Sequence, residues 1–227
     1  YDSYTKLMLH MEGSGNSFVD SAASKAVTTN GDVTQTTAQF KFSSKSGVFD
    51  GTGDYLSLAD SDDWNFGSGD FTIDFWVRFN TFPTLSAIYQ QYVDTTHYAS
   101  IFISSSSSIE LSVRNGGSEI INPVGTLSSV TTGVWYHFAL VRNGNIWRWY
   151  QDGSSIGSIT NTNSIPDFAG GVVIGKHTHW TGGDNYINGY LDELRISKGI
   201  ARWTSNFTPP SSPYGKVYTV TGTKKFG

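Results

Sequence analysis

The sequence predicts an all-β fold, a β-sandwich of two antiparallel sheets arranged as a jelly roll. Short stretches of alternating apolar and polar residues recur along the chain, and turn-forming residues separate them. The 227 residues include 25 glycines, and amphipathic helical runs are nearly absent. Aromatic residues make up 15% of the chain, which supplies enough large side chains for a sizeable core.

In chain order, short strands are expected at residues 39–42, 47–50 and 54–58, and a longer one follows at residues 71–79. The longer strand, FTIDFWVRF, alternates strictly between apolar and mostly polar side chains. Because neighbouring side chains on a strand point to opposite faces, we expect one buried face and one polar face. The expected buried residues are Phe71, Ile73, Phe75, Val77 and Phe79.

Further strands are expected at residues 86–91, 98–103 and 109–115, and the serines at 104–108 form the turn between the last two. After them, WYHFALVRNG and NIWRWYQDG, together residues 135–153, predict a hairpin. Its turn is Asn143-Gly144, a favoured sequence for a two-residue hairpin loop, and Asp152-Gly153 makes a second turn. On the second strand of this hairpin, the side of Trp147 and Trp149 is expected to face the core.

The last expected strands lie at residues 171–175 and 187–197. The prolines of NFTPPSSPY then favour an extended exit, because proline cannot donate to a sheet. We therefore expect one domain over residues 1–214, followed by a tail or the start of another module at 215–227. The chain begins at Tyr1 without an initiator methionine or a signal peptide, so we expect it to be a piece of a longer protein.

Composition argues against several kinds of partner. The net charge is −4, and the 15 lysine and arginine residues are scattered, so no nucleic-acid partner is expected. With no cysteine, the chain has neither disulfides nor thiolate metal sites. No apolar run reaches the roughly 18 residues that a membrane span requires, so none is expected.

The densest charge cluster is GYLDELRISKGIARW, residues 189–203. Strand alternation places Glu193 beside Arg195 on one face and Asp192 on the other, with Leu194 and Ile196. Carboxylates on opposite faces cannot flank one glycosidic bond at the separation of about 5–9 Å that acid/base pairs need. Glu193 and Arg195 instead predict a surface salt bridge. Asp192, on the apolar side, needs either backbone N–H donors or a cation such as Ca²⁺.

Four blocks of the sequence resemble the laminin-G-like jelly-roll domains of the concanavalin A-like lectin/glucanase superfamily. They are FDGTGDYLSLADSDDWNFGSGDFTIDFWVRF, VWYHFALVRNG, WYQDG and INGYLDELRISKGIARWTSNFTPP. The opening LMLHMEGSGNSFVDSA also matches, so the resemblance covers about residues 4–214. The versions most similar to this sequence occur in bacterial surface proteins and in phage or marine viral structural proteins.

The resemblance implies a concanavalin A-like sandwich with a concave face that often binds carbohydrate. It also implies that Ca²⁺, where present, joins the first and last strands, which nominates Asp20 and Asp192. The hairpin departs from the family pattern at Trp147, Trp149 and Gln151, where smaller or apolar residues are usual.

Catalysis is not expected. The glucanases that the sequence resembles carry acidic residues at alternate positions of one strand, so that nucleophile and acid project from one face. Here the nearest alternation, Asp70, Thr72 and Asp74, holds only two acids, and the outer face around Asp74 is simply polar. The sequence therefore indicates a protein that is not an enzyme.

Two stretches combine aromatic and polar side chains as a sugar site does. In GKHTHWTGGDNY, Trp180 or Tyr186 would stack on a sugar ring, and hydrogen bonds would come from His179, Asp184 and Asn185. In YQQYVDTTHY the corresponding aromatic residues are Tyr92 and Tyr98. Either stretch is equally well an exposed loop. Arg148 would bind an acidic sugar if its side of the sheet is the concave one.

These features predict a non-catalytic carbohydrate-binding or adhesion module at an extracellular or virion surface. Its expected partner is a glycan or cell-surface polysaccharide. One alternative is a structural or decoration domain that assembles with a neighbouring structural protein, to which the tail 215–227 would add a strand. A further alternative is the targeting module of a larger glycoside hydrolase.

Overall fold

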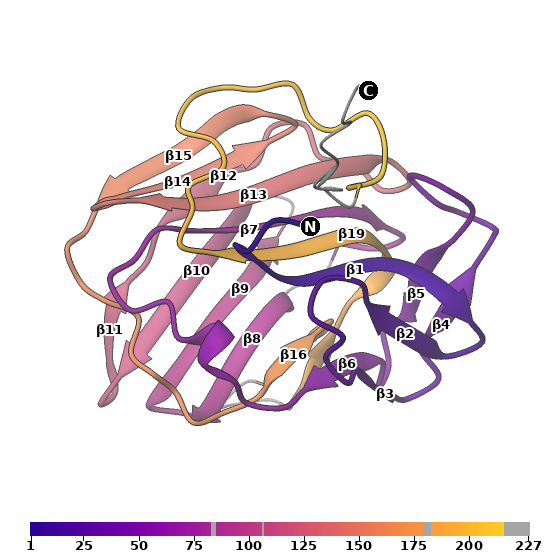
Figure 1. Cartoon of the computed structure of the whole chain (residues 1–227), viewed down its shortest axis with the longest axis horizontal. Coiled ribbons are helices and arrows are strands. Elements are labelled where there is room, and N and C mark those ends of the chain that lie inside the picture. The colour runs from indigo at the N-terminus through magenta and orange to yellow at the C-terminus, as the bar shows by residue number, and fades with distance from the viewer. Residues whose placement is uncertain (83–84, 106, 179–182, 216–227) are drawn as a thin grey trace, which may run out of the picture.

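The computed structural model describes residues 1–82, 85–105, 107–178 and 183–215, and it confirms the predicted all-β fold. Two antiparallel sheets lie face to face (Figure 1). A separate sheet of two strands accompanies them. In the described part of the chain, the one helical element is a 3₁₀ turn, η1 (Asp62–Trp64). None of the described helices is long and apolar enough to cross a membrane.

The first large sheet has nine strands. Seven of them follow the order β15-β14-β13-β7-β19-β1-β2, while β5 pairs with β19 and β4 pairs with β5. The strands are β1 (Thr5–Ser14), β2 (Ser17–Asp20), β4 (Thr34–Thr36), β5 (Ser46–Asp50), β7 (Phe71–Phe79), β13 (Trp135–Asn143), β14 (Ile146–Gln151), β15 (Ser154–Thr160) and β19 (Asn188–Lys198).

The second large sheet has eight strands, in the order β11-β10-β9-β8-β16-β6-β3, with β12 paired to β10. These are β3 (Thr28–Asn30), β6 (Tyr55–Leu58), β8 (Ser86–Asp94), β9 (His97–Ser105), β10 (Ser108–Asn115), β11 (Ser118–Ile121), β12 (Val124–Thr126) and β16 (Val172–Ile174). The small sheet pairs β17 (Lys176–His177) with β18 (Asn185–Tyr186).

Most expected strands are confirmed, but the strand at residues 39–42 is wrong, since this stretch is an irregular connection between β4 and β5. The first hairpin turn is Gly144-Asn145, one residue later than expected, because Asn143 pairs with Ile146. The second turn, Asp152-Gly153, is confirmed. Strands β1 to β4 were not among the expected elements.

The core between the sheets contains the apolar face of β7 and, as expected, Trp147 and Trp149, which are fully buried. The indole N–H of Trp149 donates to the Pro123 carbonyl at 2.9 Å, so its polar atom is satisfied. The unusual Gln151 also has a structural use. Its side-chain amide accepts from the backbone N–H of Ser128 at 2.9 Å and donates to the carbonyl of the same residue at 2.7 Å.

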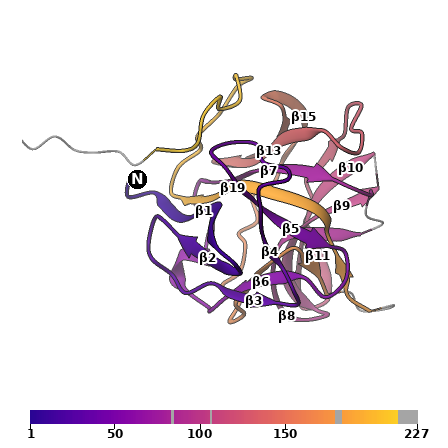
Figure 2. The same ribbon diagram turned by 90° about the vertical axis from the view of Figure 1, so that its right-hand side faces the viewer.

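The second face of β7 is also buried at Thr72, Asp74 and Trp76, whereas Arg78 is half-buried, which corrects the expectation of a polar outer face. Residues 199–214, called the strap from here on, run back over the outer side of the nine-stranded sheet (Figure 2). Trp203 and Phe207 of the strap stack at 4.0 Å between ring centroids, and each forms a T-shaped contact with His137 on β13 at 5.7 Å between centroids. The strap therefore gives this sheet an apolar cover on the side away from the core.

A β-bulge in β19 overturns the expected alternation around Asp192. The register shifts between Asp192 and Arg195, and Glu193 has a left-handed φ of 50°. As a result Asp192 lies opposite Trp76, on the outer face and not on the apolar side, and Glu193 also makes its contacts there. The two carboxylates are therefore not on opposite faces, and that argument against an acid pair was wrong.

The expected surface salt bridge between Glu193 and Arg195 is wrong for the same reason. Arg195 lies opposite Asp74 on β7, and its guanidinium donates twice to that carboxylate, at 2.9 and 3.2 Å. Asp74 is fully buried, and burial alone would raise its pKa, but Arg195 and His137 together hold the pKa below its usual value. Glu193 instead pairs with His10 on β1, at 2.6 Å.

Candidate functional site

A pocket of about 150 Å³ opens on the outer face of the eight-stranded sheet. Side chains from β8, β9, β10, β11 and β17 form most of it, so segments that are far apart in sequence build one site. The lining residues are Leu85, Tyr92, Thr95, Tyr98, Phe102, Ser112, Arg114, Glu119, His177 and Thr178.

Strand alternation explains why the floor of this pocket is polar and aromatic. On β9 and β10, Ile101 and Leu111 face each other on the core side. The intervening residues point outward, and the register places Tyr98 opposite Arg114. One face of these strands therefore fills the core, and the opposite face forms the pocket floor.

The aromatic part of the pocket consists of two ring pairs. Tyr92 on β8 and Tyr98 on β9 stack at 6.3 Å between centroids with an interplanar angle of 25°. Phe102 and His177 lie 5.3 Å apart, and His177 is almost completely buried. These faces offer flat apolar surface next to polar groups, as a small-molecule site requires.

The wall formed by His177 and Thr178 is fixed to the sheet by Gln90 of β8. The Gln90 side-chain carbonyl accepts from the Thr178 backbone N–H at 2.9 Å, and its amide donates to the Thr178 carbonyl at 3.3 Å. Because Gln90 is itself buried, this pair of bonds positions the wall firmly.

The charged groups of the pocket are Arg114 and Glu119, with His177 as a titratable neighbour. Glu119 accepts from the Ser112 hydroxyl at 2.6 Å and from the Asn122 amide at 3.1 Å. With one fixed cation and one carboxylate, the lining has no net formal charge when His177 is neutral. This balance suits an uncharged polar ligand.

The structure brings together only some of the expected site residues. Tyr92 and Tyr98 both line the pocket. Tyr186, Asp184 and Asn185 lie on or beside β18, where the Tyr186 ring is 6.4 Å from Tyr55.

The carboxylate of Asp184 pairs with Lys176 at 2.8 Å. The small sheet of β17 and β18 thus contributes His177 to the pocket but keeps these three expected residues outside its lining. His179 and Trp180 lie outside the described residues.

Arg148 belongs to a different part of the molecule. It lies on β14 of the nine-stranded sheet, and its guanidinium donates to the Thr204 carbonyl of the strap at 2.6 Å. It therefore holds the strap and takes no part in the pocket.

The strand residues of the pocket that the sequence did not suggest are Phe102 on β9, Ser112 and Arg114 on β10, and Glu119 on β11. A signal for them was present, since 109–115 was an expected strand whose polar alternate positions include Ser112 and Arg114. What sequence could not supply was the register between β8, β9 and β10, which decides which side chains meet.

The surroundings of Asp20 and Asp192 do not fit a calcium ion. Calcium takes six to eight oxygen ligands, whereas these carboxylates are surrounded by N–H donors. Asp192 accepts from two backbone N–H groups, those of Lys41 and Phe42. Asp20 accepts from four, those of Met8, Ala22, Ala23 and Lys25. Calcium binding at these residues stays a prediction.

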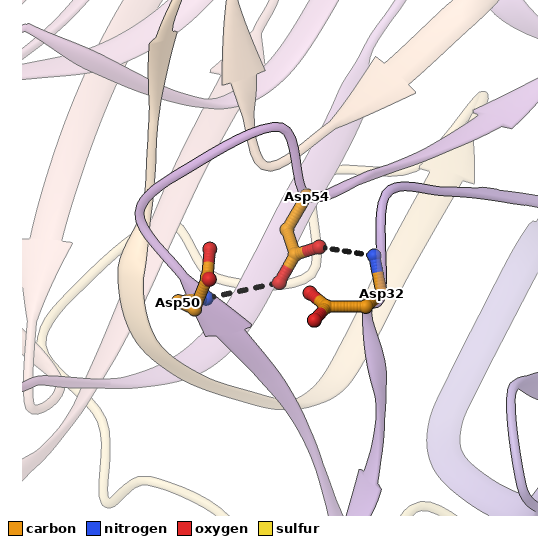
Figure 3. Close-up of side chains that lie close together, drawn as sticks. All are labelled: Asp32, Asp50 and Asp54. Atoms are coloured by element: carbon orange, nitrogen blue, oxygen red, sulfur yellow. Dashed lines mark hydrogen bonds between the residues drawn. The ribbon is translucent and has the colours of Figure 1, made fainter.

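Asp32, Asp50 and Asp54 lie together in a group (Figure 3), and one carboxylate oxygen from each lies within 4.8 Å of the others. The part of the chain that the structure describes holds no second such group. Asp54 is buried and accepts from the backbone N–H groups of Asp32, at 2.8 Å, and Asp50, at 3.0 Å. Burial raises its pKa. Asp54 thus ties two chain segments together, while the carboxylates of Asp32 and Asp50 are exposed.

Comparison with known proteins supports the fold. The family described as the concanavalin A-like lectin/glucanases superfamily matches residues 50–202. A comparison with curated proteins finds none that matches this sequence.

Among solved structures, the binding domain of Paraclostridial Mosquitocidal Protein 1 has a TM-score of 0.66 and 16% identity, over 87% of this chain and 49% of that one. The binding domain of Botulinum Neurotoxin DC in complex with SialylT has a TM-score of 0.64 and 17% identity, over 87% and 48%. This chain thus spans about half the length of these toxin structures.

Domain 4 of AbnA, a GH43 extracellular arabinanase from Geobacillus stearothermophilus, was solved in complex with arabinotriose. It has a TM-score of 0.60 and 18% identity, over 87% of this chain and 95% of that one. At these identities the likeness concerns the fold.

Proposed function

Since the chain belongs to the concanavalin A-like lectin/glucanase superfamily, we propose that it is a non-catalytic module that binds carbohydrate in the pocket of the eight-stranded sheet. The observation that carries this proposal is the pairing of Tyr92 and Tyr98 beside polar groups on one outer face. Sugar rings have an apolar face that packs on aromatic side chains and hydroxyls that bond to polar ones.

The ligand that suits the pocket best is an uncharged sugar unit. Tyr98 and Tyr92 would pack against the ring, while Ser112, Thr178 and Arg114 would bond to its hydroxyls. An acidic sugar would add a negative charge that the lining does not balance, because the formal charges of Arg114 and Glu119 already cancel.

The pocket lacks the two carboxylic acids that most glycoside hydrolases use. Among the described residues that line it, Glu119 is the one acid, and both of its oxygens already accept hydrogen bonds. Asp192 and Glu193 lie on the other sheet, are 1% exposed, and bond to protein groups. This arrangement supports binding without hydrolysis.

The wider setting that we propose is an exterior surface, either of a cell or of a virus particle, where the module would adhere to a glycan. A second candidate is the targeting module of a larger glycoside hydrolase. The likeness to the arabinanase domain favours it, because that likeness covers almost the whole of a domain solved with arabinotriose.

A glycan array with the full chain, run with calcium and with chelator, tests the proposal. We expect binding to neutral glycans in both conditions. The Tyr98→Ala variant should then weaken binding at least tenfold in calorimetry, because stacking and burial of one sugar face are lost. Tyr4→Ala is the matched control, since Tyr4 is an exposed tyrosine outside the pocket.

A blank array with a folded protein would overturn the proposal and favour the assembly role. If Tyr98→Ala weakens glycan binding no more than Tyr4→Ala does, the sugar binds elsewhere on the protein. Binding of neutral arabinan oligosaccharides alone would favour the targeting module over the adhesion module.

A further inference from the structure

The end of the strap is bound by buried charged groups. The Tyr214 ring lies 3.7 Å from the Arg195 guanidinium, its hydroxyl donates to the Asp74 carboxylate, and its backbone N–H donates to Glu193 at 2.8 Å. Strands β7 and β19 thus form a socket for one tyrosine. The strap is held here by specific polar contacts as well as by apolar packing.

A histidine connects this socket to the start of the chain. His10 Nδ1 lies 2.6 Å from Glu193 Oε1, and His10 Nε2 bonds to the Tyr1 hydroxyl. The same Tyr1 hydroxyl lies 3.5 Å from the backbone carbonyl of Tyr214. His10 Nε2 and the Tyr214 carbonyl are therefore both acceptors for the Tyr1 hydroxyl, which has only one hydrogen to donate.

The protonation state of His10 decides between these acceptors. When the imidazole is neutral, Nδ1 must carry its hydrogen, because the Glu193 carboxylate only accepts. Nε2 is then an acceptor and takes the hydroxyl hydrogen of Tyr1. The Tyr214 carbonyl receives nothing from Tyr1 in this state.

When His10 takes up a proton at Nε2, that nitrogen becomes a donor and bonds to the Tyr1 oxygen. The Tyr1 hydrogen is released from His10 and turns to the Tyr214 carbonyl. We propose that His10 is a proton-operated clasp, in which one proton redirects Tyr1 and tightens the end of the strap. The charged imidazole also attracts Glu193, which binds the Tyr214 N–H.

Three groups of the socket, Asp74, Arg195 and Tyr214 itself, keep their state between pH 5 and 8. Burial works against the charge on both Asp74 and Arg195, but their mutual attraction lowers the pKa of Asp74 and raises that of Arg195. Burial also raises the pKa of Tyr214, so its hydroxyl stays protonated. These three groups therefore do not supply a change in this pH range.

Three other groups near the clasp need a control. His137 Nε2 lies 3.5 Å from the Tyr214 hydroxyl, and Glu12 lines the surface pocket beside His10. Asp192 precedes Glu193 in the chain, and burial raises its pKa to about 7. A variant that changes His10 alone separates the clasp from all three.

The test is amide hydrogen exchange of the full chain at pH 5.5 and pH 8, corrected for the intrinsic exchange rate. The amide of Tyr214 reports the strap, and the amide of Ile73 in β7 reports the core. At pH 5.5 the Tyr214 carbonyl gains one hydrogen bond from Tyr1. We therefore expect the exchange protection of the Tyr214 amide, relative to that of the Ile73 amide, to be roughly two- to tenfold higher at pH 5.5 than at pH 8. Equal relative protection at the two pH values would overturn the proposal.

His10→Gln and Tyr1→Phe should each abolish this difference. Glutamine keeps one donor and one acceptor but takes up no proton, whereas phenylalanine has no hydroxyl to redirect. His97→Gln is the matched control, because His97 pairs with Asp94 in the β8–β9 turn, and its difference should match the wild type. A pH difference that persists in His10→Gln would assign the effect to His137, Glu12 or Asp192 and contradict the clasp.

Discussion

Asp192 and Glu193 are neighbours with the same functional group, and the bulge gives each of them a separate set of partners. Asp192 accepts from two backbone N–H groups of the connection that precedes β5. Glu193 bonds to His10 and Tyr214. Both carboxylates are almost fully buried, but Asp192 is held by backbone N–H groups and not by a cationic side chain, and burial raises its pKa from 3.8 to about 7.

This raised pKa predicts a pH-dependent stability. The folded state holds a proton on Asp192 that the unfolded state releases above about pH 4, so the free energy of unfolding falls as the pH rises from about 4 to about 7. Asp192→Asn removes this term and keeps a carbonyl to accept from Lys41 and Phe42. The variant should match the wild type near pH 4 and exceed it at pH 8 by on the order of 4 kcal/mol, because each unit of pKa shift is worth about 1.4 kcal/mol.

Urea unfolding of both proteins at pH 4, 6 and 8 measures this difference, and other titrating groups cancel in the comparison. A variant that is less stable than the wild type at pH 8 would show that the fold requires the charged carboxylate.

The same residue offers a test for calcium. Because Asp20 and Asp192 are surrounded by N–H donors, we expect calcium to change the melting temperature of the wild type and of Asp192→Asn equally. Thermal unfolding in calcium and in chelator gives both shifts. A calcium shift of several degrees that occurs only in the wild type would instead place the ion at Asp192.

At the scale of elements, the strap depends on the tight turn between β14 and β15. The Gly153 carbonyl accepts from the Phe207 N–H at 2.9 Å, and Gly153 has a φ of 77°. A Cβ at this position would lie 1.8 Å from the Phe207 carbonyl oxygen. This is a close approach between two backbones that only glycine permits.

Gly153→Ala should therefore destabilise the protein far more than the same change in the preceding turn. Gly144 has a similar φ of 59°, but a Cβ added there would have no described atom within 4 Å beyond its chain neighbours. We expect a cost of about 1 kcal/mol for Gly144→Ala and at least about 3 kcal/mol for Gly153→Ala, measured by urea unfolding. Equal costs would mean that the strap moves away from the added methyl group at Phe207 without any further loss of stability.

The elements that sequence predicted are those in which alternation continues for several residues, such as β7, β10 and β13. Prediction from sequence failed where a tertiary contact, and not the alternation of residues, determines which side chains are buried. The outer face of β7 looked solvated because the strap that covers it follows more than a hundred residues later. The bulge at Glu193 was invisible because an extra residue in a strand leaves the composition unchanged.

At the scale of the molecule, the outer faces of the two large sheets hold different features. The pocket occupies the outer face of the eight-stranded sheet. The strap runs over the outer side of the nine-stranded sheet (Figure 2), and the Tyr1 hydroxyl lies next to the end of the strap at Tyr214. The pocket could be predicted only in part, through Tyr92 and Tyr98, because it joins strands whose register depends on the whole sandwich. The packed core lies between the two faces.

This separation predicts that ligand binding and strap docking are independent. Tyr98→Ala should remove most of the affinity and leave the free energy of unfolding within about 1 kcal/mol of the wild type, because Tyr98 is only partly buried. Gly153→Ala should do the reverse. Since the two sites share no contacting residues, the effects should add in the double variant within about 0.5 kcal/mol.

The four proteins are the wild type, the two single variants and the double variant. Calorimetry with the glycan identified on the array measures their affinities, and urea unfolding measures their stabilities. If Gly153→Ala lowers the affinity more than threefold while the protein remains folded, the core transmits the state of the strap to the pocket. In that case the clasp at His10 would also influence sugar binding, and the affinity of the wild type would depend on pH in a way that His10→Gln removes.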